Sequence, residues 1–227
     1  IIDTGADTDH PSLDPDAFTY AVKDSGATLM TAADLTDTVL EQLNASKKMP
    51  GVTADQLYVN AKIPYGFNYV DDDLDITHAN DKQGDHGSHV TGIAAGNRFI
   101  KNEDGSFSPA LDTALTQGVA PDAQVFVMKV FGTNGGAKDS DYMAAIEDAI
   151  VLGCDSVNLS LGSGNPGASR TDNQVYAAVM ESLVNSDTVV TMSAGNSGHW
   201  AEHTVHKGLY DDGINFAQLL SIKKINI

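Results

Sequence analysis

The chain has 227 residues, of which 41% are hydrophobic and 21 are glycine, and this favours one folded α/β domain over a disordered chain. There are 31 acidic and 13 basic residues, so the formal net charge is −18. Because contacts with phosphate backbones need clustered lysine and arginine, this charge excludes nucleic acid as a partner. The same acidic density fits a well-solvated secreted surface and calcium sites equally well.

A single cysteine, Cys154, excludes an intrachain disulfide. The sequence contains no apolar run long enough to cross a bilayer, so we expect no membrane span in this chain. The chain begins with Ile1-Ile2-Asp3 rather than with methionine, so the absence of a signal peptide from it is uninformative. We therefore expect a piece of a longer protein, cut inside a strand.

The chain opens with a short apolar strand that ends at Asp3 and is followed by a hydroxyl residue and a glycine turn. In α/β folds, the carboxyl ends of parallel strands are where the chemistry usually takes place. An aspartate in such a turn also commonly bonds its own backbone. The position alone therefore leaves both a catalytic and a turn-forming role open for Asp3.

Residues 14–63 are expected to form an insertion or an elaborated loop. Within it, Thr31 and Asp34 form a capping pair. A stripe of apolar residues then predicts an amphipathic surface helix that ends at Pro50-Gly51. The stripe consists of Leu35, Val39, Leu40 and Leu43. We expect a further short helical turn over 55–61 and no catalytic chemistry in this region.

A strand is predicted over 65–70, and it is followed by an acidic segment, 71–75, with four carboxylates in five positions. Carboxylate oxygens are ligands that calcium prefers, so a structural calcium site is one interpretation. The segment lacks the glycine and the terminal glutamate of an EF-hand loop. A solvated acidic loop is the other interpretation.

The segment 85–96 reads Asp-His-Gly-Ser-His-Val-Thr-Gly-Ile-Ala-Ala-Gly and places small and apolar residues at helical spacing. We expect a helix that begins at His86 and buries Val90, Ile93 and Ala94. An imidazole exchanges its proton near neutral pH, which suits His86 as a general base. A satisfied surface histidine and a metal site formed by His86 and His89 are the alternatives.

Residues 97–116 are polar and irregular, and a surface loop is predicted there. From Gly118 onward, apolar strands alternate with helices at lengths typical of a parallel sheet with right-handed crossovers. The predicted strands are 124–130, 156–161 and 188–193, and the predicted helices are 139–152 and 173–184. The expected fold class is therefore α/β.

Asp3, His86 and Asn196 all fall at the ends of core elements. Asn196 follows a predicted strand among glycines, so its amide can point into a cleft, although a turn asparagine is the alternative. In acyl transfer to a serine, a carboxylate orients an imidazole and the imidazole takes the proton of the serine. A hydrogen-bond donor then stabilises the oxyanion.

Three sequence blocks, in this order, resemble the subtilisin-like serine proteases (subtilases, peptidase family S8). They are Asp3-Thr4-Gly5, His86-Gly87-Ser88-His89-Val90 and Ser193-Ala194-Gly195-Asn196-Ser197-Gly198. Gly118-Val119-Ala120-Pro121 and Asn158-Leu159-Ser160-Leu161-Gly162 add to the resemblance, which covers residues 1–198. Ser88 stands where threonine is commoner and keeps the hydroxyl. Residues 63–69, together with the long insertion, are similar to lactocepin-type cell-envelope proteinases.

The resemblance implies a truncated three-layer α/β fold with a mostly parallel sheet and helices on both faces. It implies that Asp3 is the orienting acid, His86 the general base and Asn196 the oxyanion donor, with His89 buried outside the triad. It also implies that polypeptide substrates bind by strand addition to a cleft. The residues implied to line that cleft are Ser160, Leu161, Gly162, Ala194 and Gly195.

The Gly-Thr-Ser-x-Ala-x-Pro block that carries the subtilase nucleophile does not occur in these 227 residues, and neither does a Gly-x-Ser-x-Gly elbow. Residues 199–227 form an atypical tail that fits no subtilase block. We expect residues 1–227 to be a partial catalytic domain of a secreted or cell-envelope serine endopeptidase. Its chemistry needs no cofactor, and this chain alone is expected to be inactive. The alternative is a non-catalytic, subtilase-derived protein that binds peptides.

Overall fold

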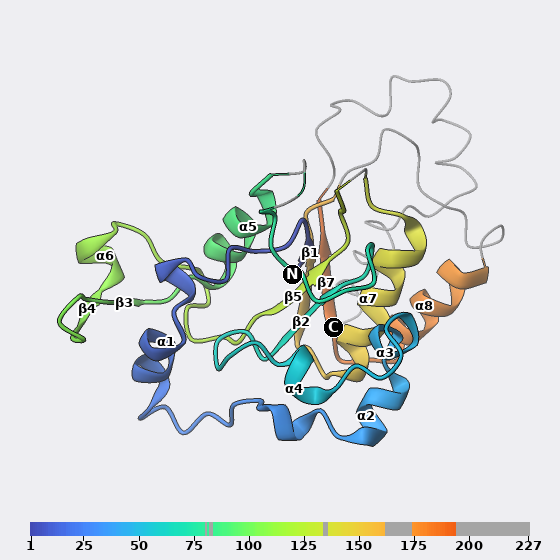
Figure 1. Cartoon of the computed structure of the whole chain (residues 1–227), viewed down its shortest axis with the longest axis horizontal. Coiled ribbons are helices and arrows are strands. Elements are labelled where there is room, and N and C mark those ends of the chain that lie inside the picture. Colours follow the sequence, from blue (N-terminus) through green and yellow to red (C-terminus); the bar gives the residue numbers. More distant parts are fainter. Residues whose placement is uncertain (80, 82–83, 134–135, 162–173, 194–227) are drawn as a thin grey trace. The chain divides into compact units, whose positions relative to one another are not determined.

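The computed structural model describes residues 1–79, 81, 84–133, 136–161 and 174–193. They belong to two compact units, Ile1–Ala145 and Ile146–Ile227, and the division falls within helix α7 (Asp139–Val151). Both units combine parallel strands with helices (Figure 1). The structure thus has the α/β class and the parallel strand pairing that the sequence predicts.

The first unit is built on three parallel strands, β1 (Ile2–Asp3), β2 (Tyr65–Asn68) and β5 (Phe126–Lys129). Strand β5 pairs with both of the others. Asp3 and Asn68 are each in register with Lys129, so the carboxyl ends of the three strands are level. This shared edge is where the sequence places Asp3.

Helices of the first unit are short, and several begin at a side-chain cap. Asp14 accepts a hydrogen bond from the backbone N–H of Ala17 at 2.7 Å and so caps α1, whose first residue is proline. The helices before strand β2 are η1 (Pro11–Leu13), α1 (Pro15–Val22), η2 (Ala32–Asp34), α2 (Asp37–Gln42), α3 (Asn44–Lys48) and α4 (Ala54–Leu57).

The insertion contains the predicted capping pair but not the predicted continuous helix. Thr31 and Asp34 form a capping box, which opens the single turn η2. Of the apolar stripe, only Val39 and Leu40 lie in α2, whereas Leu35 precedes it. Leu43 separates α2 from α3, because it has an extended backbone (φ −69°, ψ 138°) and is fully buried. The prediction of one amphipathic helix was therefore wrong, and the predicted turn over 55–61 lies slightly earlier, as α4.

The predicted surface loop over 97–116 contains regular structure. Strands β3 (Phe99–Lys101) and β4 (Phe107–Pro109) form an antiparallel hairpin that leads into helix α6 (Ala110–Thr113). The ring of Tyr20 in α1 stacks on Phe107, with centroids 4.4 Å apart, and meets Phe99 edge-on at 5.0 Å. Aromatic packing against α1 thus holds a hairpin whose strands are too short and polar to be recognised in the sequence.

Helix α5 (His86–Ala95) begins at the predicted residue, and two of the three residues predicted to be buried, Val90 and Ala94, are half-buried, with Ala94 packed against the core. The third, Ile93, is not buried and is 68% exposed. The buried residues of the helix are Gly87, Thr91 and Ala95. A Cβ atom at position 87 would lie 2.1 Å from the carbonyl oxygen of Gly5. The helix therefore approaches the turn after β1 so closely that only small residues fit between them.

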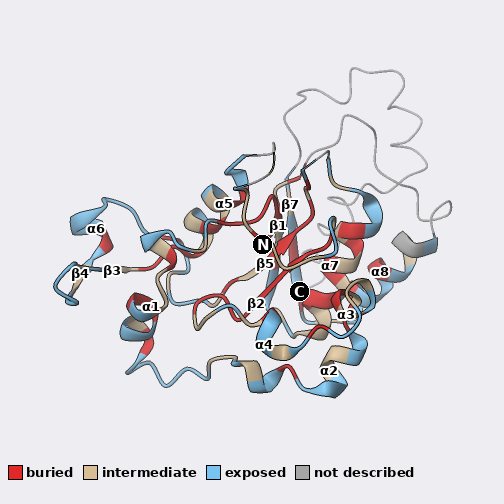
Figure 2. Cartoon of the chain, viewed as in Figure 1, coloured by how far each residue is buried: buried red, intermediate tan, exposed pale blue. Residues whose placement is uncertain are grey.

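A hydrophobic core cluster in the first unit combines residues of η1, α5 and β5 with loop residues. The members of the cluster are Ala6, Leu13, Ile63, Ile76, Ala95, Val125 and Val127. Figure 2 colours strands β1, β2 and β5 as buried over most of their length. In the second unit, β6 (Ser156–Leu159) pairs in parallel with β7 (Val189–Met192), and helix α8 (Gln174–Val184) lies between them in the sequence. Within the described residues, none of the helices has the length and apolar character needed to cross a bilayer.

Candidate active site

Asp3 occupies the last position of β1 and is 1% exposed. The turn that follows requires glycine, because Gly5 has φ +97° and a Cβ there would lie 2.3 Å from the Ile76 carbonyl oxygen. One carboxylate oxygen, Oδ1, accepts a hydrogen bond from the Thr4 backbone N–H at 2.8 Å. This bond is the turn-forming interaction considered for Asp3, and it occupies only part of the carboxylate.

The same oxygen lies 2.7 Å from Nδ1 of His86. A carboxylate can only accept, so Nδ1 carries the proton and Nε2 is left as the basic nitrogen of the ring. The acid is buried, whereas the His86 side chain is 54% exposed. Strand β1 and helix α5 therefore present an oriented imidazole to solvent, with its acid protected behind it.

Thr4 fixes both sides of His86, a role that sequence analysis missed. Its hydroxyl donates to the carbonyl oxygen of Gly84 at 3.2 Å and accepts from the backbone N–H of Gly87 at 2.9 Å. The signal was present, since a hydroxyl residue stands between the acid and the glycine of the first block. Ser88 makes a second link, in which its hydroxyl accepts from the Asp7 backbone N–H at 2.8 Å.

His89 is exposed, which corrects the expectation of a buried residue. Its side chain is 70% exposed, and Nε2 lies 3.2 Å from Oδ2 of Asp85 on the first turn of the helix. This hydrogen bond holds the pKa of Asp85 below its usual value. The two histidines thus bond to different carboxylates, and the described residues include no group of three or more His, Cys, Asp or Glu that could hold a metal ion.

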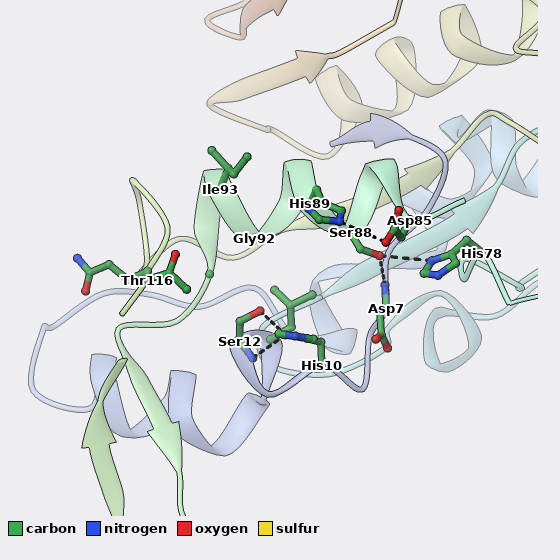
Figure 3. A pocket seen from close by; sticks show the side chains of 13 residues that line it. Asp7, His10, Ser12, His78, Asp85, Ser88, His89, Gly92, Ile93 and Thr116 are labelled. Atoms are coloured by element: carbon green, nitrogen blue, oxygen red, sulfur yellow. Dashed lines mark hydrogen bonds and ion pairs between the residues drawn. The ribbon is translucent and has the colours of Figure 1, made fainter. Parts of the chain in front are cut away.

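A pocket of about 400 Å³ lies beside α5 (Figure 3). Figure 3 shows the Ser88 hydroxyl between the His78 ring, 3.4 Å away, and the backbone of Asp7. Three histidines and two aspartates contribute to the lining, namely His10, His78, His89, Asp7 and Asp85. Neither Asp3 nor His86 lines this pocket, so it is separate from the acid–base pair.

The acidic segment 71–75 bonds mainly to its own loop. The amide of Asn68 donates to Oδ2 of Asp71 at 3.2 Å and to Oδ1 of Asp73 at 3.0 Å. Oδ1 of Asp73 also accepts from the Asp75 backbone N–H at 2.9 Å, and Asp75 accepts from the backbone N–H and hydroxyl of Thr77. These oxygens stabilise a turn by bonding backbone and side-chain donors of the same loop.

Two of the residues implied to bind substrate are described, and both follow β6. The Ser160 hydroxyl accepts from the Asn158 amide at 2.9 Å, and the Leu161 carbonyl oxygen accepts from the Ser193 hydroxyl at 2.5 Å. The other three cleft positions, Gly162, Ala194 and Gly195, lie outside the described residues, and so does the predicted oxyanion donor Asn196. The roles of all these residues, Ser160 and Leu161 included, stay predictions.

The structure thus places an aspartate at the end of a parallel strand and bonds it to an exposed histidine at a helix start, which is the arrangement that the acid and the base of a Ser-His-Asp triad have. A family model described as "Subtilase family" matches residues 1–223, and the chain belongs to this family. The resemblance identified from the sequence blocks is thereby confirmed.

Named relatives also agree with the predicted similarity to lactocepin-type proteinases. The chain is 39% identical over 145 residues to a PI-type proteinase of Lactococcus lactis subsp. cremoris, which is 62% of the chain and 7% of the relative. It is 33% identical over 202 residues to a PII-type proteinase of Lacticaseibacillus paracasei, covering 87% of the chain and 9% of the relative. It is 32% identical over 138 residues to the minor extracellular protease Vpr of Bacillus subtilis, covering 59% of the chain and 15% of the relative. The matched part is thus a small fraction of each relative.

Proposed function

We propose that this chain supplies the acid and the general base of a serine endopeptidase that cleaves polypeptides through an acyl-enzyme. The observation that carries the proposal is the 2.7 Å contact between the buried Asp3 carboxylate and Nδ1 of the exposed His86. A buried carboxylate is costly unless it is fully bonded, yet Oδ2 of Asp3 has no hydrogen-bond partner among the described residues. Such a cost is typical of a functional site rather than of a structural turn.

In this proposal each residue has one task. Asp3 accepts the hydrogen bond from Nδ1–H of His86 and so keeps the proton on that nitrogen. Nε2 of His86 can then take the proton of a serine hydroxyl as the serine attacks the peptide carbonyl. His86 then returns the proton to the leaving amine. The Asn196 amide donates to the oxyanion. Residues 160–162 and 194–195 hold the extended substrate backbone.

In this proposal, the serine is supplied by a part of the protein outside these 227 residues, because the block that carries it does not occur among them. We propose no cofactor for the chemistry, since carboxylate, imidazole and hydroxyl suffice for acyl transfer. Structural calcium is not needed by any step. We place the whole protein outside the cell or in the cell envelope, a proposal supported by the named extracellular relative in Bacillus subtilis.

The deciding experiment has two parts. Sequencing the source DNA through and beyond the codon for Ile227, in all three frames, should find a Gly-Thr-Ser-x-Ala block. The complete product should then react with a fluorophosphonate, a reagent for activated serines, and His86→Ala should abolish the labelling. The isolated 227-residue chain should remain unlabelled.

A non-catalytic, peptide-binding protein is the second candidate, and the missing serine block favours it. A genuine stop codon with no such block in any frame would replace the endopeptidase proposal with this one. Amidase activity of the purified 227-residue chain that disappears in His86→Ala would instead contradict the expectation that this chain alone is inactive.

A further inference from the structure

Strand β5 carries one charged side chain in an otherwise apolar run, Val-Phe-Val-Met-Lys-Val over 125–130. This residue, Lys129, is 3% exposed and in register with Asp3 on the neighbouring strand. A buried lysine is tolerated only where its ammonium group is paired. The sequence pattern therefore raises the question of what Lys129 binds at the end of the sheet that carries Asp3.

The ammonium group of Lys129 donates to the Thr77 carbonyl oxygen and to Oδ2 of Asp81. The two side chains of this ion pair are 4% and 2% exposed. The stem of Lys129 passes beside the Gly5 turn, where a Cβ would lie 3.3 Å from its Cδ atom. Lys129 thus joins the end of β5 to the chain segment that leads into α5.

Described residues on both sides of Asp81 are attached to the turn that follows β1. Ile76 accepts from the Ala6 backbone N–H at 2.9 Å, and Gly84 accepts from the Thr4 hydroxyl at 3.2 Å. Asp81 lies between these two attachments and only five positions before His86. The ion pair is therefore the charged attachment at the middle of the segment.

We propose that Lys129 and Asp81 are positioning residues, whose ion pair, with the bond of Lys129 to Thr77, fixes the chain before α5 so that the His86 ring stays on Asp3. This inference rests on the proposed function of His86 as the general base. Lys129 does not act on the substrate, because it is buried and already donates to two acceptors. Small displacements of a catalytic group can reduce turnover strongly, so an attachment at this place has a direct effect on the reaction.

The test reads the His86–Asp3 bond by NMR in the 227-residue chain, without any substrate. The wild-type chain should show a far-downfield Nδ1 proton for His86. Lys129→Met and the milder Asp81→Asn should lose this signal while the chain stays folded. A folded variant that keeps the wild-type signal would overturn the proposal. The absence of the signal from the wild-type chain would also overturn it.

Two further variants separate positioning from simple stability. The double variant Lys129→Met with Asp81→Asn leaves no unpaired buried charge, so its thermal stability should recover, whereas the His86 signal should stay lost. Recovery of both would assign the pair a structural role only. The matched control is Lys48→Met, which removes the ion pair of Lys48 with Asp72 and Asp141 and should leave the signal unchanged.

In the complete enzyme, Lys129→Met should lower kcat by about 10²-fold with KM unchanged, because the loss concerns the base and not the substrate contacts. A rise in KM at constant kcat would overturn the proposal. The NMR result does not depend on proteolysis. A complete protein that cannot hydrolyse peptides would therefore refute the proposed function, whereas the positioning inference would still be decided by the NMR signal of His86.

Discussion

At the scale of single residues, we expect the Asp3 carboxylate to contribute more to the proposed reaction than to the free energy of unfolding. It is buried, and one of its oxygens has no partner among the residues that the structure describes. An asparagine of the same shape could still fill the site, but it would not stabilise the Nδ1–H tautomer and the positive charge that forms on His86. Function and folding should therefore respond differently to its replacement.

We predict that Asp3→Asn lowers kcat of the complete enzyme by about 10⁴-fold. Its free energy of unfolding should change by less than about 1 kcal/mol, since the lost charge-assisted bond is offset by the relief of burying a carboxylate. Fluorophosphonate labelling rates and urea unfolding measure the two effects. Near-normal labelling in Asp3→Asn would contradict an orienting role for Asp3.

Lys62 is a second buried lysine, and it differs from Lys129 in forming no salt bridge with a carboxylate among the described residues. Its ammonium group donates to the carbonyl oxygens of Pro121 and Ala123 at 2.9 and 2.8 Å and lies 4.7 Å from the Phe18 ring centroid. Burial lowers the pKa of Lys62 to about 8, and the charge of Asp122 counteracts this only in part. The folded chain therefore loses this proton at lower pH than the unfolded chain.

Because the unfolded state binds more protons between about pH 8 and the ordinary lysine pKa of about 10.4, the Lys62 contribution to stability rises with pH in that window. The increase should amount to about 3 kcal/mol when complete. Urea unfolding of the wild type and of Lys62→Met at a series of pH values isolates this contribution. If the difference between the two proteins does not change with pH, Lys62 does not titrate there.

At the scale of elements, the acid–base pair depends on how closely α5 approaches β1. The buried positions 87, 91 and 95 are spaced by four and are all small, which forms a smooth ridge on the helix. Gly87 lies against the Gly5 backbone, whereas a Cβ added to Gly92 on the same helix would meet nothing within 4 Å. The helix thus contains both a test position and its control.

Gly87→Ala should destabilise the fold by about 1–3 kcal/mol and displace His86 from Asp3, because the new methyl group overlaps the Gly5 carbonyl. Gly92→Ala should stabilise the helix by about 0.5–1 kcal/mol and leave the His86 signal unchanged. Thermal unfolding and the His86 NMR signal report both effects. If Gly87→Ala and Gly92→Ala have the same thermal stability and the same His86 signal, close packing at Gly87 does not position the helix.

The elements that could be predicted were those with clear limits. Strand β5 is a continuous apolar run, and α7 begins at acidic residues and ends before Gly153, so the sequence indicated both to within a few residues. The β3–β4 hairpin could not be recognised, because its stability comes from Tyr20 in a distant helix. The prediction that α5 buries Ile93 was wrong, because it was based on hydrophobicity alone. The close approach of β1 instead selects small residues for the buried positions of this helix.

The candidate site was also predictable only in part. The sequence blocks around Asp3 and His86 indicated that these two residues belong to one site, since each block is short and continuous in sequence. The ion pair of Lys129 with Asp81 could not be inferred, because the two residues are separated by 48 positions and meet only when the segment folds back on β5.

At the scale of the whole molecule, the net charge of −18 acts against compactness. Raising the salt concentration from about 0.01 M to about 0.15 M shortens the screening length from about 30 Å to about 8 Å and weakens this repulsion. The thermal midpoint of the chain should therefore rise with added sodium chloride. Sucrose at matched osmolality is the control, and a midpoint that salt leaves unchanged would show that repulsion does not limit stability.

The distance along the chain between the acid and the base has a consequence for biosynthesis. Asp3 and His86 are separated by 83 positions, so no local structure can bring them together. Even if some of its helices have already formed, a nascent chain has no oriented imidazole until β1, β5 and α5 have come together. The proposed capacity for proton transfer thus depends on the folded arrangement of β1 and α5, and an unfolded copy of the protein has no oriented base.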